Sequence, residues 1–262
     1  MTTIGFIGTG NMGSTLARAA AKSGKAQRLL LANRSPEKAL RLAEELGGEA
    51  LDNRSVAEQA RYLFFGVKPQ MLSGMLDGIR DVLKERRDRF VIVSMVAGKD
   101  LACLRELLGP VPVIRIMPNI PVSVGGGVTL FAASPEVREE EKHFLQELLA
   151  CSGIVDELEE GLLDAATGIT GCGPAFAALF IEALADGGVA CGLPRRKALD
   201  YAAGMLRGSA ELLLESGEHP AVLKDRVCSP AGSTIQGVRA LEEGAFRAAV
   251  MNAVIAAFEK EF

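Results

Sequence analysis

The feature that most limits how this chain can fold is a glycine-rich turn close to its start. The turn, Gly8-Thr9-Gly10-Asn11-Met12-Gly13, follows an apolar segment at Thr3–Gly8 and opens a helical pattern at Met12–Ser23. Glycines at this spacing, between a strand and a helix, are typical of the first unit of a Rossmann domain. The first allows the tight bend, the second lets a pyrophosphate approach the backbone, and the third lets helix and strand pack.

The context of the turn carries the prediction, because the spacing alone is weak evidence. With 29 glycines in 262 residues, about 0.3 copies of the spacing arise by chance. Here the turn follows an apolar strand and opens a helix near the start of the chain, where such domains usually begin. It therefore predicts a dinucleotide-binding domain.

Alternating strand-like and helical segments continue to about residue 160. A second strand is predicted at Arg28–Ala32 and a second helix at Glu37–Leu46, with a later helix from Pro135 to about Cys151. The other predicted strands are continuous apolar runs: Tyr62–Val67, Phe90–Met95, Val113–Met117, Val128–Ala132 and Ile154–Leu158. Such runs are typical of parallel strands covered on both faces, so the predicted class is α/β with a Rossmann-like doubly wound sheet.

From about residue 161 the pattern is helical only. Long Ala/Leu/Gly-rich helices are predicted at Pro174–Cys191, Arg195–Glu215 and Ala245–Phe262. The first is apolar nearly all round, which indicates cover on every side and, in so small a domain, a second subunit. We predict two domains, an NADP-binding Rossmann domain at 1–160 and an all-helical dimerisation and substrate domain at 161–262.

Charge and composition exclude several classes of protein. The net charge is −4 and no Lys/Arg block is present, so no nucleic-acid partner is expected. The uncharged stretch between Asp164 and Glu182 is shorter than the ~20 residues that a membrane span needs and contains Pro174, so a buried helix start is expected instead. Five dispersed cysteines and two histidines predict no metal site, buried reduced thiols and a cytoplasmic protein. A strand directly after Met1 leaves no room for a signal peptide.

The end of the second predicted strand indicates which dinucleotide is bound. NAD-selective sites place Asp or Glu there to accept a hydrogen bond from the ribose. This chain has Asn33-Arg34-Ser35, and a guanidinium with a hydroxyl suits a 2′-phosphate. NADP(H) is the predicted cofactor, with NAD(H) as the alternative.

Later strand ends predict the surroundings of the nicotinamide. Parallel strands bring Val67, Lys68, Met95–Ala97 and Met117–Asn119 to one edge of the sheet. Pro69 suits the start of a helix after the strand. Lys68 is either a general acid or an orienting or surface ammonium, and the sequence leaves both open.

Six segments in order resemble the pyrroline-5-carboxylate reductase family over essentially the whole chain: GFIGTGNMG, FGVKPQ, IRIMPNIP, TGITGCGPAF, ALADGGVACGLPRRKA and HPAVLKDRVCSPAGST. The resemblance implies reduction of L-1-pyrroline-5-carboxylate to L-proline by hydride transfer from NAD(P)H, the last step of proline biosynthesis. It also implies a homodimer or higher homo-oligomer whose active sites are shared between subunits.

The resemblance also implies site residues. The implied cofactor contacts are Ile7, Gly8, Thr9, Gly10, Asn11, Met12, Asn33, Arg34, Ser35, Asn53, Gly66, Val67, Lys68, Pro69, Met95, Val96 and Ala97. The predicted substrate contacts are Glu160, Ser233 and Thr234, to which we add Gly232 and Asn119. Three positions depart from the family pattern: Ala231 replaces glycine, Cys172 replaces serine, and Arg226 stands where relatives often have asparagine.

The small-residue loop Ser229–Ile235 suits the substrate chemistry. Its N–H groups and hydroxyls can bind a carboxylate, and Thr234 is the candidate to contact the ring nitrogen or relay the proton. The competing interpretation is a capped helix start with Ser or Thr as the N-cap. An imine is basic enough to arrive protonated, so the chemistry needs no His or Tyr acid, and Tyr62 and Tyr201 are interpreted as structural. His219 is expected to shape a turn and His143 to be solvated.

Two other functions remain as alternatives. A β-hydroxyacid dehydrogenase shares this domain order, but its catalytic lysine has no counterpart in Gly187–Cys191. A non-catalytic NADP(H)-responsive dimer would bind the cofactor without turnover.

Overall fold

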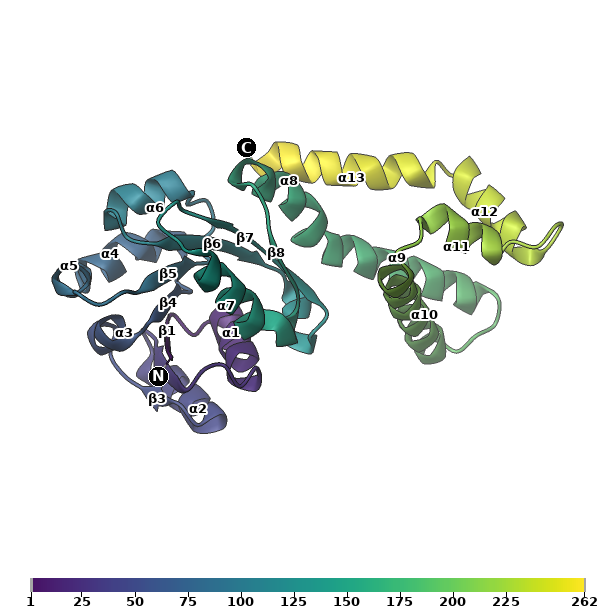
Figure 1. The fold of residues 1–262 in the computed structure, drawn as a ribbon. Helices are drawn as coiled ribbons and strands as arrows, with labels where there is room; N and C mark the ends of the chain where they lie inside the picture. The colour runs from purple at the N-terminus through teal and green to yellow at the C-terminus, as the bar shows by residue number, and fades with distance from the viewer. Residues whose placement is uncertain (1, 262) are drawn as a thin grey trace. The chain divides into compact units, whose positions relative to one another are not determined.

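The computed structural model describes residues 2–261, and its contacts divide the chain into two compact units, Met1–Gly171 and Cys172–Phe262 (Figure 1). The helix α8 (Glu160–Thr170) belongs to the first unit. The sequence-based domain boundary lies near residue 160.

The first unit is built on one eight-stranded sheet, with the order β3-β2-β1-β4-β5-β6-β7-β8. The strands are β1 (Thr3–Ile7), β2 (Arg28–Ala32), β3 (Glu49–Ala50), β4 (Tyr62–Phe65), β5 (Val91–Ser94), β6 (Val113–Pro118), β7 (Gly127–Ala133) and β8 (Gly153–Glu157). All neighbours pair in parallel except β6 and β7. The predicted doubly wound sheet is confirmed.

Two hydrophobic clusters cover the two faces of this sheet. On one face the strands pack against α1 (Asn11–Lys22), α2 (Pro36–Leu46) and α7 (Glu139–Leu149). On the other they pack against α3 (Asn53–Gln59), α4 (Leu72–Asp77), α5 (Arg80–Glu85) and α6 (Leu101–Leu108). Three short 3₁₀ segments complete the unit: η1 (Pro69–Met71), η2 (Ile120–Val124) and η3 (Ala150–Ser152).

Burial on both faces explains the continuous apolar runs. Phe6 and Phe64 stack at 4.4 Å between ring centroids on the first face, while Phe65 and Ile7 pack on the second. A strand covered on both sides has no solvated face on which polar residues could alternate.

The prediction of a helix starting at Pro135 was wrong by four residues. The helix α7 begins at Glu139, and Val137 N–H donates to the Ser134 carbonyl in a turn that precedes it. The carboxylate of Glu141 accepts from the backbone N–H of Arg138 at 3.0 Å, which caps the helix at that point.

The Glu141 carboxylate is almost fully buried, with 1% of its side chain exposed. It accepts from Arg61 at 2.8 Å and from Arg89 at 2.7 Å. These arginines precede β4 and β5, so one carboxylate fastens α7 to the beginnings of two strands. Burial alone raises the pKa of Glu141, but the hydrogen bonds from Arg89, Arg138 N–H and Arg61 outweigh it and lower that pKa to about 2.

The second unit contains helices and no strand among its described residues, which confirms the prediction for this region. Its helices are α9 (Gly173–Ala190), α10 (Arg195–Ser216), α11 (Pro220–Arg226), α12 (Ser233–Glu243) and α13 (Phe246–Glu261). Phe262, the predicted end of the last helix, lies outside the described residues.

The helical unit buries little of its apolar surface within its own chain. Among its described residues only Ala185, Ala198 and Ala202 are buried hydrophobics, while Leu179 and Leu214 are 67% and 70% exposed. One helical stretch in the described chain, Glu160–Ala190, is apolar and long enough to span a bilayer, and 11% of its most apolar window is buried. The apolar helix α9 therefore lacks the enclosing cover that its sequence calls for.

Candidate functional site

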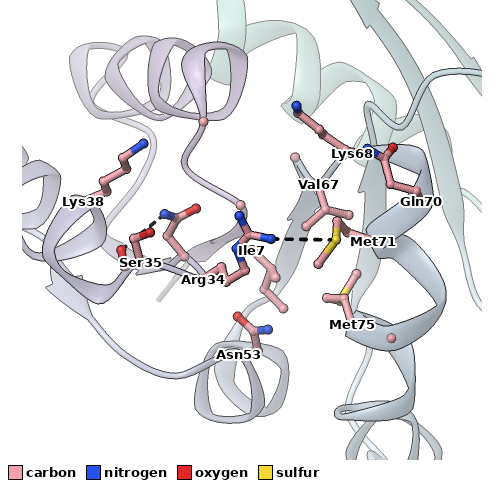
Figure 2. Close-up of a pocket in the computed structure, with 15 residues that line it drawn as sticks. Ile7, Arg34, Ser35, Lys38, Asn53, Val67, Lys68, Gln70, Met71 and Met75 are labelled. Atoms are coloured by element: carbon pink, nitrogen blue, oxygen red, sulfur yellow. Dashed lines mark hydrogen bonds between the residues drawn. The ribbon is translucent and has the colours of Figure 1, made fainter.

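A cavity of about 540 Å³ lies in the first unit at the carboxyl ends of β1, β2 and β4 (Figure 2). At this point the chain turns back across the sheet, since β1 lies between β2 and β4. Open α/β sheets bind their ligands at such a switch point. The cavity is lined by Ile7, Gly8, Gly10, Asn33, Arg34, Ser35, Lys38, Asn53, Gly66, Val67, Lys68, Gln70, Met71, Gly74 and Met75.

The three glycines of the turn are required for different reasons. Gly8 has φ +101°, and a β-carbon there would stand 2.6 Å from the Gly66 carbonyl carbon. A β-carbon on Gly13 would stand 2.1 Å from the Gly8 carbonyl oxygen. Gly10 has φ −70°, and a β-carbon there would meet no described atom within 4 Å. Neither the backbone nor the packing of this chain therefore requires glycine at position 10.

The presence of glycine at position 10 is explained by the cavity that this residue lines. Gly10 is the N-cap of α1, it lines the cavity, and no side chain caps that helix. The first N–H groups of a helix attract an anion, and a side chain at this position would keep the anion away. The turn thus fits the pyrophosphate of a dinucleotide.

Asn33 holds the glycine turn against the end of β2. Its side-chain oxygen accepts from the Thr9 N–H at 3.3 Å, and its amide donates to the Ser35 carbonyl at 3.2 Å. This bracket keeps Arg34 and Ser35 on the cavity wall and explains asparagine at the position where NAD-selective sites carry an acid.

The cavity is positively charged in a chain whose net charge is −4. Arg34, Lys38 and Lys68 line it, and no Asp or Glu is among its described lining residues. The ion pairs found within the described chain include none of these three cations. Unpaired cations gathered in one cavity indicate a polyanionic ligand, which an NADP(H) molecule is.

The structure brings most of the predicted cofactor residues together in this cavity. The predicted residues outside its lining are Thr9, Asn11, Met12, Pro69, Met95, Val96 and Ala97. Thr9 and Val96 are buried. The lining residues that sequence reasoning missed are Lys38, Gln70, Met71, Gly74 and Met75. Lys38 lies in the first turn of the helix that follows Arg34, and this position was the available signal.

The predicted substrate residues fall in both units. Glu160 lies at the start of α8, where one carboxylate oxygen accepts from the Leu101 N–H at 2.7 Å and from Arg115 at 3.3 Å. The Asn119 side chain donates to the Thr170 carbonyl and accepts from the Val128 N–H, at 2.9 Å each.

The other predicted substrate residues begin α12 in the second unit. The N-cap of that helix is Gly232, without a side-chain cap, so the interpretation of Ser233 or Thr234 as the N-cap was wrong. A β-carbon on Gly232 would stand 2.3 Å from the Ser229 Oγ. Ala231 has φ 58°, a left-handed conformation that favours glycine. The Ser233 and Thr234 hydroxyls have no hydrogen-bond partner among the described residues, and two such hydroxyls at a helix start without a side-chain cap suit a carboxylate ligand.

The remaining ionisable candidates behave as structural groups. Burial raises the pKa of Tyr62 to about 12, and this residue begins β4 at the amino edge of the sheet, away from the cavity. The His219 Nδ1 accepts from the Ala221 N–H at 3.2 Å and caps α11, as expected. His143 is solvated, with 75% of its side chain exposed. Arg226 pairs with Glu218 at 2.6 Å.

Two predictions about the cysteines had different outcomes. All five are free, as expected, but none is buried in the single chain, so the prediction of buried thiols was wrong. No cluster of metal ligands occurs among the described residues.

Comparison with known proteins gives consistent matches for both units. A family model described as pyrroline-5-carboxylate reductase dimerisation matches residues 160–261, and one described as NADP oxidoreductase coenzyme F420-dependent matches residues 3–98. The pyrroline-5-carboxylate reductase of Pisum sativum is 38% identical over 98% of this chain and 94% of its own. Pyrroline-5-carboxylate reductase 2 of Homo sapiens is 38% identical over 96% of this chain and 80% of its own.

Solved structures agree with these matches. A pyrroline-5-carboxylate reductase from Coxiella burnetii superimposes with a TM-score of 0.93 at 28% identity, covering 99% of this chain and 97% of its own. Pyrroline carboxylate reductase from Plasmodium falciparum, solved with NADP bound, gives a TM-score of 0.84 at 31% identity over the same shares.

Proposed function

The chain belongs to the pyrroline-5-carboxylate reductase family, and from this we propose how its own residues carry out the family's reaction. It reduces L-1-pyrroline-5-carboxylate to L-proline with NAD(P)H, the final step of proline biosynthesis, and it assembles as a homo-oligomer. The observation that carries the proposal is the pairing, in one chain, of a cationic dinucleotide cavity with an uncapped helix start built from small residues.

The cofactor half of the site is the cavity of the first unit. The turn at Gly8–Gly13 would hold the pyrophosphate, and Arg34 with Ser35 would hold the ribose 2′-phosphate. Met95, Val96 and Ala97 follow β5 at the same sheet edge and would lie on the side of the nicotinamide, which would supply the hydride. Lys68 lines the cavity and would act as an orienting ammonium, since an iminium ring needs no strong acid.

The substrate half of the site is the start of α12. The first N–H groups of this helix and the Ser233 hydroxyl hold the substrate carboxylate. The Thr234 hydroxyl contacts the ring nitrogen, which takes up one proton from water, either before binding or relayed by this hydroxyl. The neighbouring carbon would receive the hydride, so that the C=N double bond becomes a CH–NH single bond and the cofactor leaves oxidised. Gly232 allows close approach, and Glu160 and Asn119 complete the surroundings. Most of the rate enhancement would come from holding the carbon that donates the hydride close to the imine carbon that accepts it.

Each active site is shared between two subunits in this proposal. Support comes from the assignment of the two halves to different units: the cavity belongs to the first unit, while Ser233 and Thr234 belong to the unit that matches the dimerisation model. The poorly covered helices of that unit supply the surface for a second copy.

We place the protein in the cytoplasm. Five unpaired cysteines suit a reducing compartment. Subcellular fractionation tests this placement, and enrichment in an organelle or membrane fraction would contradict it.

The decisive assay follows the loss of NADPH absorbance with pyrroline-5-carboxylate, and then the reverse reaction with 3-hydroxy acids. We expect turnover of the imine and none of the hydroxy acids. NADPH binding without turnover of the imine would contradict the proposed function and favour a non-catalytic sensor.

Thr234→Ala tests the substrate half. Because the hydroxyl faces the substrate, we expect kcat to fall and KM for the imine to rise, together by about tenfold in kcat/KM, with little change in NADPH affinity. Thr170→Ala is a matched control, since that hydroxyl donates to the Ala166 carbonyl within α8, and the contact with Asn119 uses the main-chain carbonyl, which the substitution keeps. A large loss of NADPH affinity in Thr234→Ala would contradict its placement.

Arg34→Asp tests the cofactor half. A carboxylate would repel a 2′-phosphate but could accept from a ribose hydroxyl. We expect the Kd of NADPH to rise by about a hundredfold and that of NADH far less, measured by fluorescence titration. Equal losses for the two cofactors would mean that the 2′-phosphate lies elsewhere.

A further inference from the structure

Lys38 is an unpaired cation on the cavity wall to which the proposed cofactor site assigns no particular group of the ligand. It is exposed, it lines the cavity, and its ammonium has no ion-pair partner among the described residues. Its neighbour Glu37 is the one acid in the first turn of α2, and Glu37 does not line the cavity. The positive charge of Lys38 is therefore not neutralised by the helix that carries it.

The beginning of α2 leaves polar groups unused beside this cation. Ser35 is the N-cap of α2, yet its hydroxyl makes no capping hydrogen bond. Its carbonyl accepts both the Asn33 amide and the Lys38 N–H. An N-cap hydroxyl ordinarily accepts from the first turn of its helix, so this one remains available for a ligand.

Figure 2 shows how the two cations are distributed around the cavity. Lys38 stands on the side of Ser35, whereas the Arg34 guanidinium reaches across toward Met71 and lies 4.0 Å from its sulfur. A phosphate beside Ser35 would thus have Lys38 on the same side of the cavity and the Arg34 guanidinium on the side toward Met71.

We propose that Lys38 is a specificity-determining residue that, with Ser35 and Arg34, binds the 2′-phosphate of NADP(H). A phosphate monoester carries a charge of about −1.5 to −2 near neutral pH, which one guanidinium leaves only partly balanced. The Lys38 ammonium supplies the second charge, and the positive end of α2 adds to it. The inference deepens the proposed cofactor site and rests on that proposal.

The test compares two ligands that differ only in the phosphate, adenosine 2′,5′-bisphosphate and 5′-AMP. Calorimetric titration of the whole protein gives both Kd values for wild type, Lys38→Met, Lys38→Arg and Lys22→Met. Lys22 is a matched control, because it is exposed on α1 and lies outside the cavity lining. The arginine variant keeps the charge.

We expect Lys38→Met to weaken the bisphosphate by roughly tenfold or more and 5′-AMP by less than about twofold. Lys38→Arg and Lys22→Met should stay close to wild type, and the effect of Lys38→Met should shrink as salt rises. Equal weakening of both ligands, no weakening of the bisphosphate, or failure of wild type to prefer the bisphosphate would each overturn the inference.

The assay for the reaction keeps this inference separate from the proposed function. If the protein does not reduce the imine but still prefers the bisphosphate in a way that depends on Lys38, the proposed function is contradicted and the inference about Lys38 holds. If the protein reduces the imine but Lys38→Met does not weaken the bisphosphate, the inference about Lys38 is contradicted and the proposed function holds.

Discussion

Replacing Gly10 by alanine is expected to weaken NADPH binding by ~10- to 100-fold, the equivalent of 1–3 kcal/mol of overpacking, while leaving the apo protein folded. The backbone at position 10 has φ −70°, which alanine adopts freely, and the added β-carbon would meet no described atom within 4 Å. The β-carbon would therefore raise the free energy only of the NADPH complex, in which it would clash with the pyrophosphate. Fluorescence titration with NADPH and thermal unfolding of the apo protein measure the two quantities.

Gly13→Ala is the matched control for Gly10→Ala, with the opposite signature. Its β-carbon would stand 2.1 Å from the Gly8 carbonyl oxygen, so helix α1 would have to move off β1. We expect a loss of roughly 3 kcal/mol in the free energy of unfolding. A Gly10→Ala protein that unfolds as easily as Gly13→Ala, or one that binds NADPH normally, would show that position 10 does not face the pyrophosphate.

Glu141→Gln is expected to lower the free energy of unfolding near neutral pH by about 3 kcal/mol. The substitution leaves Arg61 and Arg89 without their buried counter-charge and weakens the cap at Arg138 N–H. Urea unfolding measures the loss. Glu140→Gln is the control, because its side chain is 71% exposed and its one ion pair among the described residues is with the exposed Arg138. It should change stability by less than about 0.5 kcal/mol.

The same carboxylate makes stability depend on acid. Folding lowers the pKa of Glu141 from 4.5 to about 2, so its contribution is complete above pH 4.5 and is lost as the pH falls toward 2. Wild type should therefore lose stability across this window, and Glu141→Gln should lose less because its amide does not titrate. An equal acid dependence in both proteins would assign the effect to other carboxylates.

The parts of the fold that were predicted are the long elements with a strong pattern. The buried runs at β4, β5 and β6 and the long helices α9 and α10 have enough residues to show their character. The two-residue edge strand β3 and the short helices α3 to α6 have too few residues for a period to emerge. The start of α7 was misplaced because Pro135 is a plausible first residue, and the true start depends on the Glu141 cap.

The candidate site was predictable where backbone chemistry restricts the residue type. Glycines at a strand-to-helix turn and the absence of an acid after β2 both carry such information. Lys38 was missed because one lysine in a helix with several charges looks solvated, and only the position of α2 brings it to the cavity. The cysteines were assigned to the interior because free cysteine is usually buried. Cys172, Cys191 and Cys228 depart from this rule in a unit whose helices are largely uncovered within the chain, and Cys103 and Cys151 are half-buried in the first unit.

Those uncovered helices have a consequence for how the enzyme persists at low abundance. Within the described part of the second unit, only three alanines are buried hydrophobics, too little to offset the conformational entropy of its helices. Their stability must come from association, so folding and assembly become one equilibrium governed by mass action. We therefore expect the stability of these helices to fall as the protein is diluted. Limited proteolysis at a series of protein concentrations measures this dependence.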